Sequence, residues 1–190
     1  MALRNIIKEG DPALRRKSRE VGEVTDRIRE ILGDMVDTMR ENRGVGLAGP
    51  QIGIMRRLFV AEPDPEADPP LVYYMVDPEI YEEEGSEIDE EGCLSVPGLI
   101  GDVERPYRVK IRAKDFNGDL QDYEFGGFAA RIMCHENDHL NGILYIDKAI
   151  DVREPVYEYD EEDDEMYDDS ETEIENDAEA KIKTKPREAE

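Results

Sequence analysis

Histidine and cysteine are scarce in this sequence, and long apolar segments are absent from it. Its 190 residues include only two histidines and two cysteines. Two cysteines do not make a disulfide framework, which favours a reducing, cytoplasmic location. No apolar run of about 18 residues occurs, so we expect no transmembrane helix and no membrane association. The N-terminus also lacks the apolar stretch of a secretory signal.

Basic residues are few relative to acidic ones. The chain has 24 Lys and Arg against 49 Asp and Glu, a formal net charge of −25. Phosphates would be repelled, so we expect no direct binding of nucleic acid. The acidic residues are densest after residue 152, where the composition is too polar to form a core. We therefore expect a catalytic domain at 1–152 and a disordered, solubilising tail at 153–190, with docking to a basic partner as the alternative role for the tail.

The spacing of apolar residues predicts two main helices. One lies between residues 24 and 43, with Thr25 as its N-cap. The other begins near Gly127 and ends at Asn141, where Gly142 suits a left-handed C-terminal cap. A shorter helix is predicted at 13–17, after a proline.

Short segments rich in β-branched and aromatic residues predict strands. These segments are 57–60, 71–76, 108–112 and 122–125. Proline-rich residues 61–70 predict a loop, and Asn117-Gly118 predicts a hairpin turn between the last two strands. The expected fold class is α+β, with short, mostly antiparallel strands in small sheets around a central helix that carries both histidines.

Both histidines occur in one segment, His135-Glu136-Asn137-Asp138-His139. On a helix, residues i and i+4 lie on the same face, so both imidazoles can reach one metal ion. Glu136 lies beside them as a proton carrier, which favours metal-assisted hydrolysis. The alternative is a core helix that contains two histidines by chance, and the absence of histidine elsewhere weakens it.

A catalytic metal site needs further ligands and a neighbour that stabilises charge. Cys93 offers a thiolate, whereas Cys134 is rotated about 100° from His135 around the helix and is expected to pack as a small apolar residue. Three protein ligands would leave one position open, as in catalytic sites. The glycine-rich segment 44–53 contains Gln51, whose side chain could donate a hydrogen bond to an oxyanion. It lacks the Gly-Lys-Ser/Thr ending of a phosphate loop, so nucleotide binding is not supported.

Three motifs together resemble those of the peptide deformylase family. They are Gly-Val-Gly-Leu-Ala-Gly-Pro-Gln at 44–51, Glu-Gly-Cys-Leu-Ser at 91–95 and His-Glu-Asn-Asp-His-Leu-Asn-Gly at 135–142. The resemblance covers about residues 1–152 and leaves out the acidic tail. One departure is Gly49, which stands where the family usually has alanine and removes no catalytic group.

The resemblance implies a role for each matching residue. Cys93, His135 and His139 would be the metal ligands. Glu136 would be the general base that takes a proton from the attacking water and returns it to the departing amine. The oxyanion would be held by the metal, the side chain of Gln51 and the backbone N–H of Leu94.

The implied substrate is an N-formyl peptide that begins with methionine, from which the formyl group leaves as formate. Val45, Phe128 and Ile132 are the predicted lining of an apolar pocket for the methionine side chain, with core packing as their alternative role. Segments Val45–Leu47 and Gly92–Leu94, which include Gly46 and Gly92, are predicted to pair with the peptide as an added strand.

Supporting contacts and partners are also predicted. Glu91 and Arg105 are expected to form an ion pair beneath the cysteine, and Asp138 to support a ligand or anchor the helix. The ligand set alone suggests zinc, whereas the resemblance suggests one Fe2+ per chain, with Ni2+ or Co2+ also able to act. We expect a monomer that acts on nascent polypeptides near the ribosome.

Two other functions stay open on the sequence alone. A zinc protease with the His-Glu-x-x-His motif would need neither the glycine-rich loop nor a cysteine ligand. A non-catalytic, metal-stabilised binding module would be expected to lack Glu136 or Gln51, and both are present.

Overall fold

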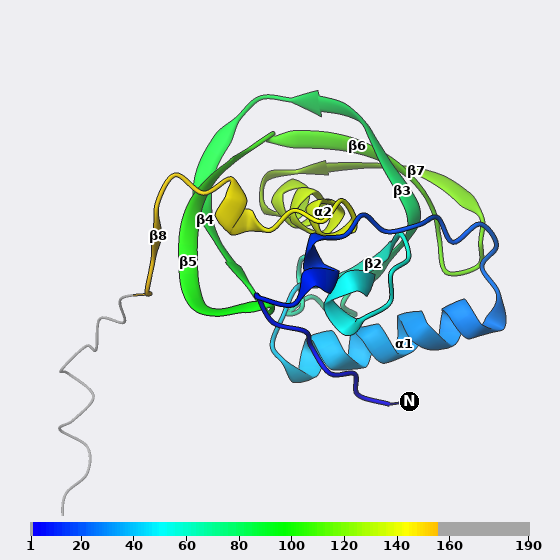
Figure 1. Ribbon diagram of the computed structural model, residues 1–190. Coiled ribbons are helices and arrows are strands. Elements are labelled where there is room, and N and C mark those ends of the chain that lie inside the picture. Colours follow the sequence, from blue (N-terminus) through cyan, green and yellow to red (C-terminus); the bar gives the residue numbers. More distant parts are fainter. Residues whose placement is uncertain (1, 156–190) are drawn as a thin grey trace, which may run out of the picture. The chain divides into compact units, whose positions relative to one another are not determined.

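The computed structural model describes residues 2–155, in which antiparallel strands surround one helix (Figure 1). The two α-helices are α1 (Asp26–Glu41) and α2 (Gly127–Leu140). Short 3-10 helices are η1 (Pro12–Arg15), η2 (Gly49–Ile52) and η3 (Tyr145–Asp147). The strands are β1 (Gly46–Ala48), β2 (Leu58–Ala61), β3 (Tyr73–Glu84), β4 (Glu87–Cys93), β5 (Val96–Arg105), β6 (Arg108–Lys114), β7 (Leu120–Gly126) and β8 (Val152–Arg153).

The strands form two antiparallel sheets. The larger sheet has the order β1-β2-β3-β6-β7, and the smaller has the order β4-β5-β8. Strand β3 continues through a turn at Gly85 into β4, and this connection joins the two sheets. Figure 1 shows that the sheets curve around α2, while α1 lies outside them.

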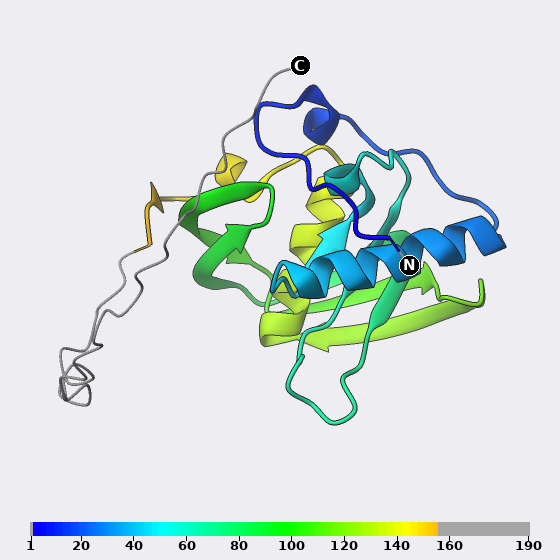
Figure 2. The same cartoon turned by 90° about the horizontal axis from the view of Figure 1, so that it is seen from below.

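Two of the three apolar clusters of the core meet at strand β2, which is buried on both faces. Phe59 and Ala61 belong to the core cluster that includes α2, whereas Leu58 and Val60 belong to the cluster that includes α1. Successive side chains of a strand point to opposite faces, so four consecutive apolar residues serve both clusters. Figure 2 shows α1 on one side of these strands and α2 on the other. Helix α2 therefore lies in the interior, where the two curved sheets surround it.

Most predicted elements are confirmed within a few residues. Helix α1 lies inside the predicted range 24–43, and Thr25 occupies the N-cap position, although its side chain makes no capping hydrogen bond. The predicted strands correspond to β2, β3, β6 and β7, although β3 continues to Glu84, well past its predicted end at residue 76. Asn117-Gly118 lies in the turn between the last two strands. The prediction of a helix at 13–17 is wrong in type and extent, since η1 is a 3-10 helix that ends at Arg15.

Four strands were not predicted (β1, β4, β5 and β8), and one of them, β4, carries the first three residues of the second motif. Strands β4 and β5 form a hairpin whose residues are mostly exposed, charged or glycine. Their pairing, from Glu87 opposite Arg105 to Cys93 opposite Val96, makes them strands despite weak propensity. Strand β1 lies in the glycine-rich segment and pairs with β2.

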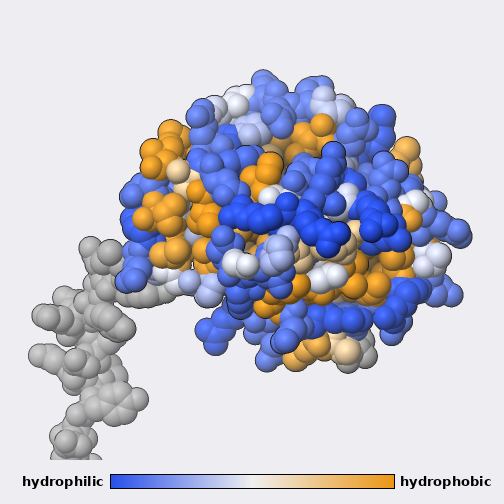
Figure 3. Space-filling model, in the orientation of Figure 1, coloured by the Kyte–Doolittle hydropathy of each residue, from blue (hydrophilic) through white to orange (hydrophobic). Residues whose placement is uncertain are grey.

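The face drawn in Figure 3 is mainly hydrophilic. Figure 3 shows apolar areas between hydrophilic ones, the clearest over β4 and β5. Within residues 2–155, no helix has the length and apolar character needed to cross a membrane. Arg153 still lies in β8, and the predicted disordered tail from there on falls almost entirely outside the described residues.

Candidate metal centre and active site

Helix α2 carries both predicted histidine ligands and the predicted base Glu136 into the interior. It ends at Leu140, and Gly142 follows with φ of 76°, which confirms the predicted left-handed conformation at the helix end. A Cβ at Gly142 would lie 2.6 Å from the carbonyl oxygen of Arg15, so no larger residue fits there. This close contact with the N-terminal segment fixes the end of the helix that holds His139.

The structure brings Cys93, His135 and His139 together. One ligand atom from each lies within 4.8 Å of the other two. Cys93 Sγ is 3.3 Å from His139 Nε2. One thiol sulfur and two imidazole nitrogens that converge in this way are a donor set that fits a single divalent transition metal ion.

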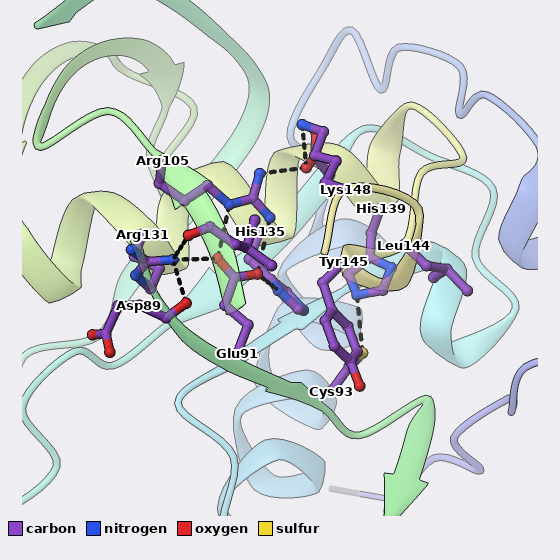
Figure 4. A network of polar contacts seen from close by, with 12 residues as sticks. Asp89, Glu91, Cys93, Arg105, Arg131, His135, His139, Leu144, Tyr145 and Lys148 are labelled. Carbon is purple, nitrogen blue, oxygen red and sulfur yellow. Dashed lines mark hydrogen bonds and ion pairs between the residues drawn. The ribbon is translucent and has the colours of Figure 1, made fainter. Parts of the chain in front are cut away.

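Glu91 orients one of the two imidazoles. Its Oε2 lies 2.8 Å from His135 Nδ1, which leaves Nε2 of that ring as the ligand atom. Arg105 donates two hydrogen bonds to the Glu91 carboxylate, at 2.8 and 2.9 Å, and one at 2.5 Å to Asp138. The predicted Glu91–Arg105 pair is thus confirmed, and Asp138 supports the site through Arg105 (Figure 4).

Burial and neighbours change the pKa values of these groups. Burial alone would raise the pKa of Glu91, but the bonds from Arg105 and His135 hold it at about 2. Burial alone would lower the pKa of His135, while Cys93 and Glu91 raise it above its usual value. Burial lowers the pKa of His139, which favours the neutral ring that metal binding requires.

Glu136 faces the glycine-rich segment rather than Glu91. A Cβ on Gly46 would lie 2.4 Å from Glu136 Oε1, so the carboxylate packs directly on the backbone of β1. Its Oε2 is buried without a protein partner. Burial raises the pKa of Glu136 to about 7, which suits a group that must accept and release a proton near neutral pH.

The amide of Gln51 lies next to Cys93. Its Oε1 accepts a hydrogen bond from the backbone N–H of Ala48 at 2.8 Å, which leaves its NH2 group free to donate. That Nε2 lies 3.1 Å from Ser95 Oγ and 3.5 Å from Cys93 Sγ. The side chain is 1% exposed, so it is held firmly with its donor directed at the cysteine turn.

Gly49, the departure from the family pattern, has a structural reason. A Cβ at this position would lie 2.7 Å from the carbonyl oxygen of Ile54 and 3.0 Å from that of Arg56. The segment after η2 therefore packs closer to position 49 than an alanine allows.

The residues predicted to bind substrate differ in their burial and in the elements that carry them. Val45 is half-buried and packs on the main core, and Ile132 is buried in it. Phe128 is 55% exposed, so the alternative role of core packing is wrong for this residue. Gly46 and Gly92 lie in β1 and β4, the strands that flank the cluster.

Sequence reasoning missed three residues at the site. Ser95 receives the hydrogen bond from Gln51, and the ring of Tyr145 stacks on His135 with centroids 6.1 Å apart. Arg131 is 4% exposed and lies 3.0 Å from Glu91 Oε1. The sequence carried a signal for two of them, since Ser95 belongs to the second motif and Arg131 is a charged residue in the apolar part of the second helix. Cys134 is buried in the core, as predicted, and burial raises its pKa to about 12.

The central helix carries two histidines and a glutamate, and a strand supplies a cysteine beside them. This arrangement defines a class of metal-dependent hydrolases. Comparisons with known proteins identify the family within that class. The family model described as polypeptide deformylase matches residues 3–154. The peptide deformylase of Thermoanaerobacter pseudethanolicus is 46% identical over 150 residues, which are 79% of this chain and 91% of that protein.

Solved structures agree. The crystal structure of peptide deformylase from Thermotoga maritima has a TM-score of 0.74 at 36% identity and covers 80% of this chain and 100% of its own. The Met-Ala-Ser-bound enzyme from Acinetobacter baumannii has a TM-score of 0.71 at 35% identity, with 77% and 98% covered. The chain belongs to the polypeptide deformylase family. It is a metallohydrolase that removes the formyl group from new peptides, and the protease and binding-module alternatives are not supported.

Proposed function

We propose that Cys93, His135 and His139 hold one divalent metal ion and that Glu136, Gln51 and Leu94 carry out the hydrolysis around it. The observation that carries this proposal is the convergence of the three ligand atoms within 4.8 Å of one another, beside a buried carboxylate. When bound, the cation supplies Lewis acidity that activates water and stabilises charge on oxygen.

The chain's own groups then divide the remaining work. Glu136 accepts a proton from the attacking water and returns it to the departing amine, a role supported by its pKa of about 7. The Gln51 amide and the Leu94 backbone N–H donate hydrogen bonds to the oxygen that gains negative charge. The Gln51 donor needs little reorganisation, because Ala48 already fixes its carbonyl.

The proposed metal in the cell is Fe2+, with Zn2+, Ni2+ and Co2+ as ions the site also accepts. A thiolate and two imidazoles bind all four of these ions, so the choice among them depends on supply and oxidation as well as on ligands. Metal analysis of protein purified without oxygen, compared with protein purified in air, measures this choice. We expect iron in the first sample and zinc in the second.

The proposed substrate is an N-formylmethionyl nascent polypeptide, met near the ribosome in the cytoplasm by a monomeric enzyme. The Met-Ala-Ser bound by the Acinetobacter baumannii relative supports a peptide that begins with methionine. We assign the methionine side chain to a pocket beside Val45, Phe128 and Ile132. The peptide backbone would pair with β1 and β4 around Gly46 and Gly92, the two strands nearest the cluster. Residues 1–152 form the proposed catalytic domain, and 153–190 a solubilising tail.

The deciding experiment is formate release from formyl-Met-Ala-Ser. We expect turnover that stops with a chelator and returns with Fe2+ or Co2+. Cys93→Ser should lose both tight metal binding and turnover, while Cys134→Ser should keep both, since that thiol belongs to the core and not to the ligand cluster. Full formate release by the Cys93→Ser variant would refute the proposed ligand set, and cleavage within unformylated peptides would refute the proposed reaction.

A further inference from the structure

Arg131 is a buried cation that the proposed reaction does not use. Its side chain is 5% exposed, and it lies on α2 four residues before His135, one turn away on the same face. A buried guanidinium is costly unless its donors are satisfied, so its contacts indicate what it stabilises.

Within residues 2–155, every side-chain hydrogen bond of Arg131 leads to the β4–β5 hairpin. Nη1 lies 3.0 Å from Glu91 Oε1 and 2.8 Å from the carbonyl oxygen of Val103. Nη1 and Nη2 also reach the carbonyls of Asp89 and Glu87, at 3.3 and 3.0 Å. Figure 4 shows Arg131 and Arg105 approaching Glu91 together.

The two arginines fix the hairpin to α2 on either side of His135. Arg105 extends from β5 to Asp138, which follows His135 on the helix. Arg131 extends from the helix, before His135, to β4 and β5. Cys93 belongs to β4 and the imidazoles to α2, so the spacing between hairpin and helix determines the spacing between sulfur and nitrogen.

We propose that Arg131 is a positioning residue that holds Glu91 and the β4–β5 hairpin against α2. Cys93 and His135 then meet one metal ion in a fixed geometry, so this inference rests on the proposed metal site. It acts through Glu91, whose other oxygen binds His135 Nδ1. Substitution of such outer partners commonly weakens metal binding by about 10–100-fold.

The test compares Arg131→Met with Arg57→Met. Arg57 also anchors α2, through Asn137 and Asn141, but does not touch Glu91, so it is a matched control. We expect Arg131→Met to bind Co2+ about tenfold more weakly in chelator competition and to change the visible spectrum of the Co2+ protein. Arg57→Met should lower the Tm while both metal readouts stay at their wild-type values.

A second variant keeps the test decisive if Arg131→Met fails to fold. Lysine retains the charge but cannot bridge the carboxylate and the carbonyls together, so Arg131→Lys should bind Co2+ about threefold more weakly. Wild-type Co2+ affinity and spectrum in the folded variants would overturn the inference, because Arg131 would then stabilise the fold without positioning the metal ligands. Absence of the sulfur-to-Co2+ absorption band in the wild-type protein would instead refute the proposed metal site itself.

Discussion

At the scale of single residues, Glu136 combines burial with an oxygen that has no protein partner. Its proposed work is proton transfer, which requires the carboxylate and not merely its shape. We therefore expect Glu136→Gln to bind metal as the wild type does and to release formate about 10²–10⁴ times more slowly. Bound metal per chain and kcat, measured on the same preparation, check this expectation. Turnover within a factor of a few of wild type would remove Glu136 from the mechanism.

Gly46 gives a second prediction, because its missing side chain makes room for that carboxylate. A Cβ there would lie 2.4 Å from Glu136 Oε1 and 2.8 Å from its carboxyl carbon. Gly46→Ala should displace the carboxylate. Because a small misplacement of a catalytic group slows the reaction strongly, kcat should fall about tenfold or more. Unchanged kinetics in Gly46→Ala would mean that Glu136 has another productive position.

The sequence allowed the convergence of Cys93, His135 and His139 to be predicted because the chemistry of these side chains is explicit. Histidine and cysteine are rare in this chain. Two histidines at i and i+4 and a cysteine outside any disulfide framework have few alternative roles. The contacts of Gln51 with Ser95 and of Arg131 with Glu91 could not be predicted in this way. They depend on which strands pack against η2 and α2, and neither distance is encoded in local residue spacing.

At the scale of elements, predictability follows burial. Helices α1 and α2 bury apolar side chains at helical spacing, and strand β2 is a continuous apolar run buried on both faces, so both patterns are visible in the sequence. The β4–β5 hairpin consists largely of acidic residues, glycines and a proline. Its two segments are strands because their backbones pair in an antiparallel register, which the residue types do not reveal. The hairpin that carries Cys93 was therefore the part of the site least visible in the sequence.

Helix α1 contains a glycine whose replacement should stabilise the protein. Gly33 lies within the helix, and a Cβ there would meet no atom within 4 Å. Gly33→Ala removes flexibility from the unfolded chain at no steric cost, so the free energy of unfolding should rise by about 0.5–1 kcal/mol. Urea unfolding measures the change, and formate release should be unaffected.

Gly22 is the matched control for that prediction. It also has nothing within 4 Å of a built Cβ, but its φ is 81°, in the left-handed region. Gly22→Ala should therefore destabilise the protein. If both alanine variants changed stability with the same sign, backbone conformation would not be the cause of either effect.

At the scale of the whole molecule, buried carboxylates fasten α1 and the N-terminal segment to the rest of the protein. Asp34 on α1 accepts hydrogen bonds from the Ala2 N–H and from Arg4. Glu62, which follows β2, accepts two from Arg40 on α1, at 2.9 and 2.5 Å. The backbone N–H of Ala2 and the guanidinium of Arg4 lower the pKa of Asp34, and Arg40 lowers that of Glu62.

These lowered pKa values make stability depend on acid. Because each folded-state pKa lies below its unfolded value, the stabilisation is complete above roughly pH 5 and is lost as the pH falls through the folded pKa. Asp34→Asn with Glu62→Gln should lower the free energy of unfolding at pH 7 by about 2 kcal/mol in total and flatten its decline between pH 5 and 3. Urea unfolding at several pH values measures both effects. Glu30→Gln is the control, since Glu30 pairs with Arg27 with both side chains about 60% exposed, and its loss should change little. An equally steep acid dependence in the double variant would show that other carboxylates control the acid stability of this fold.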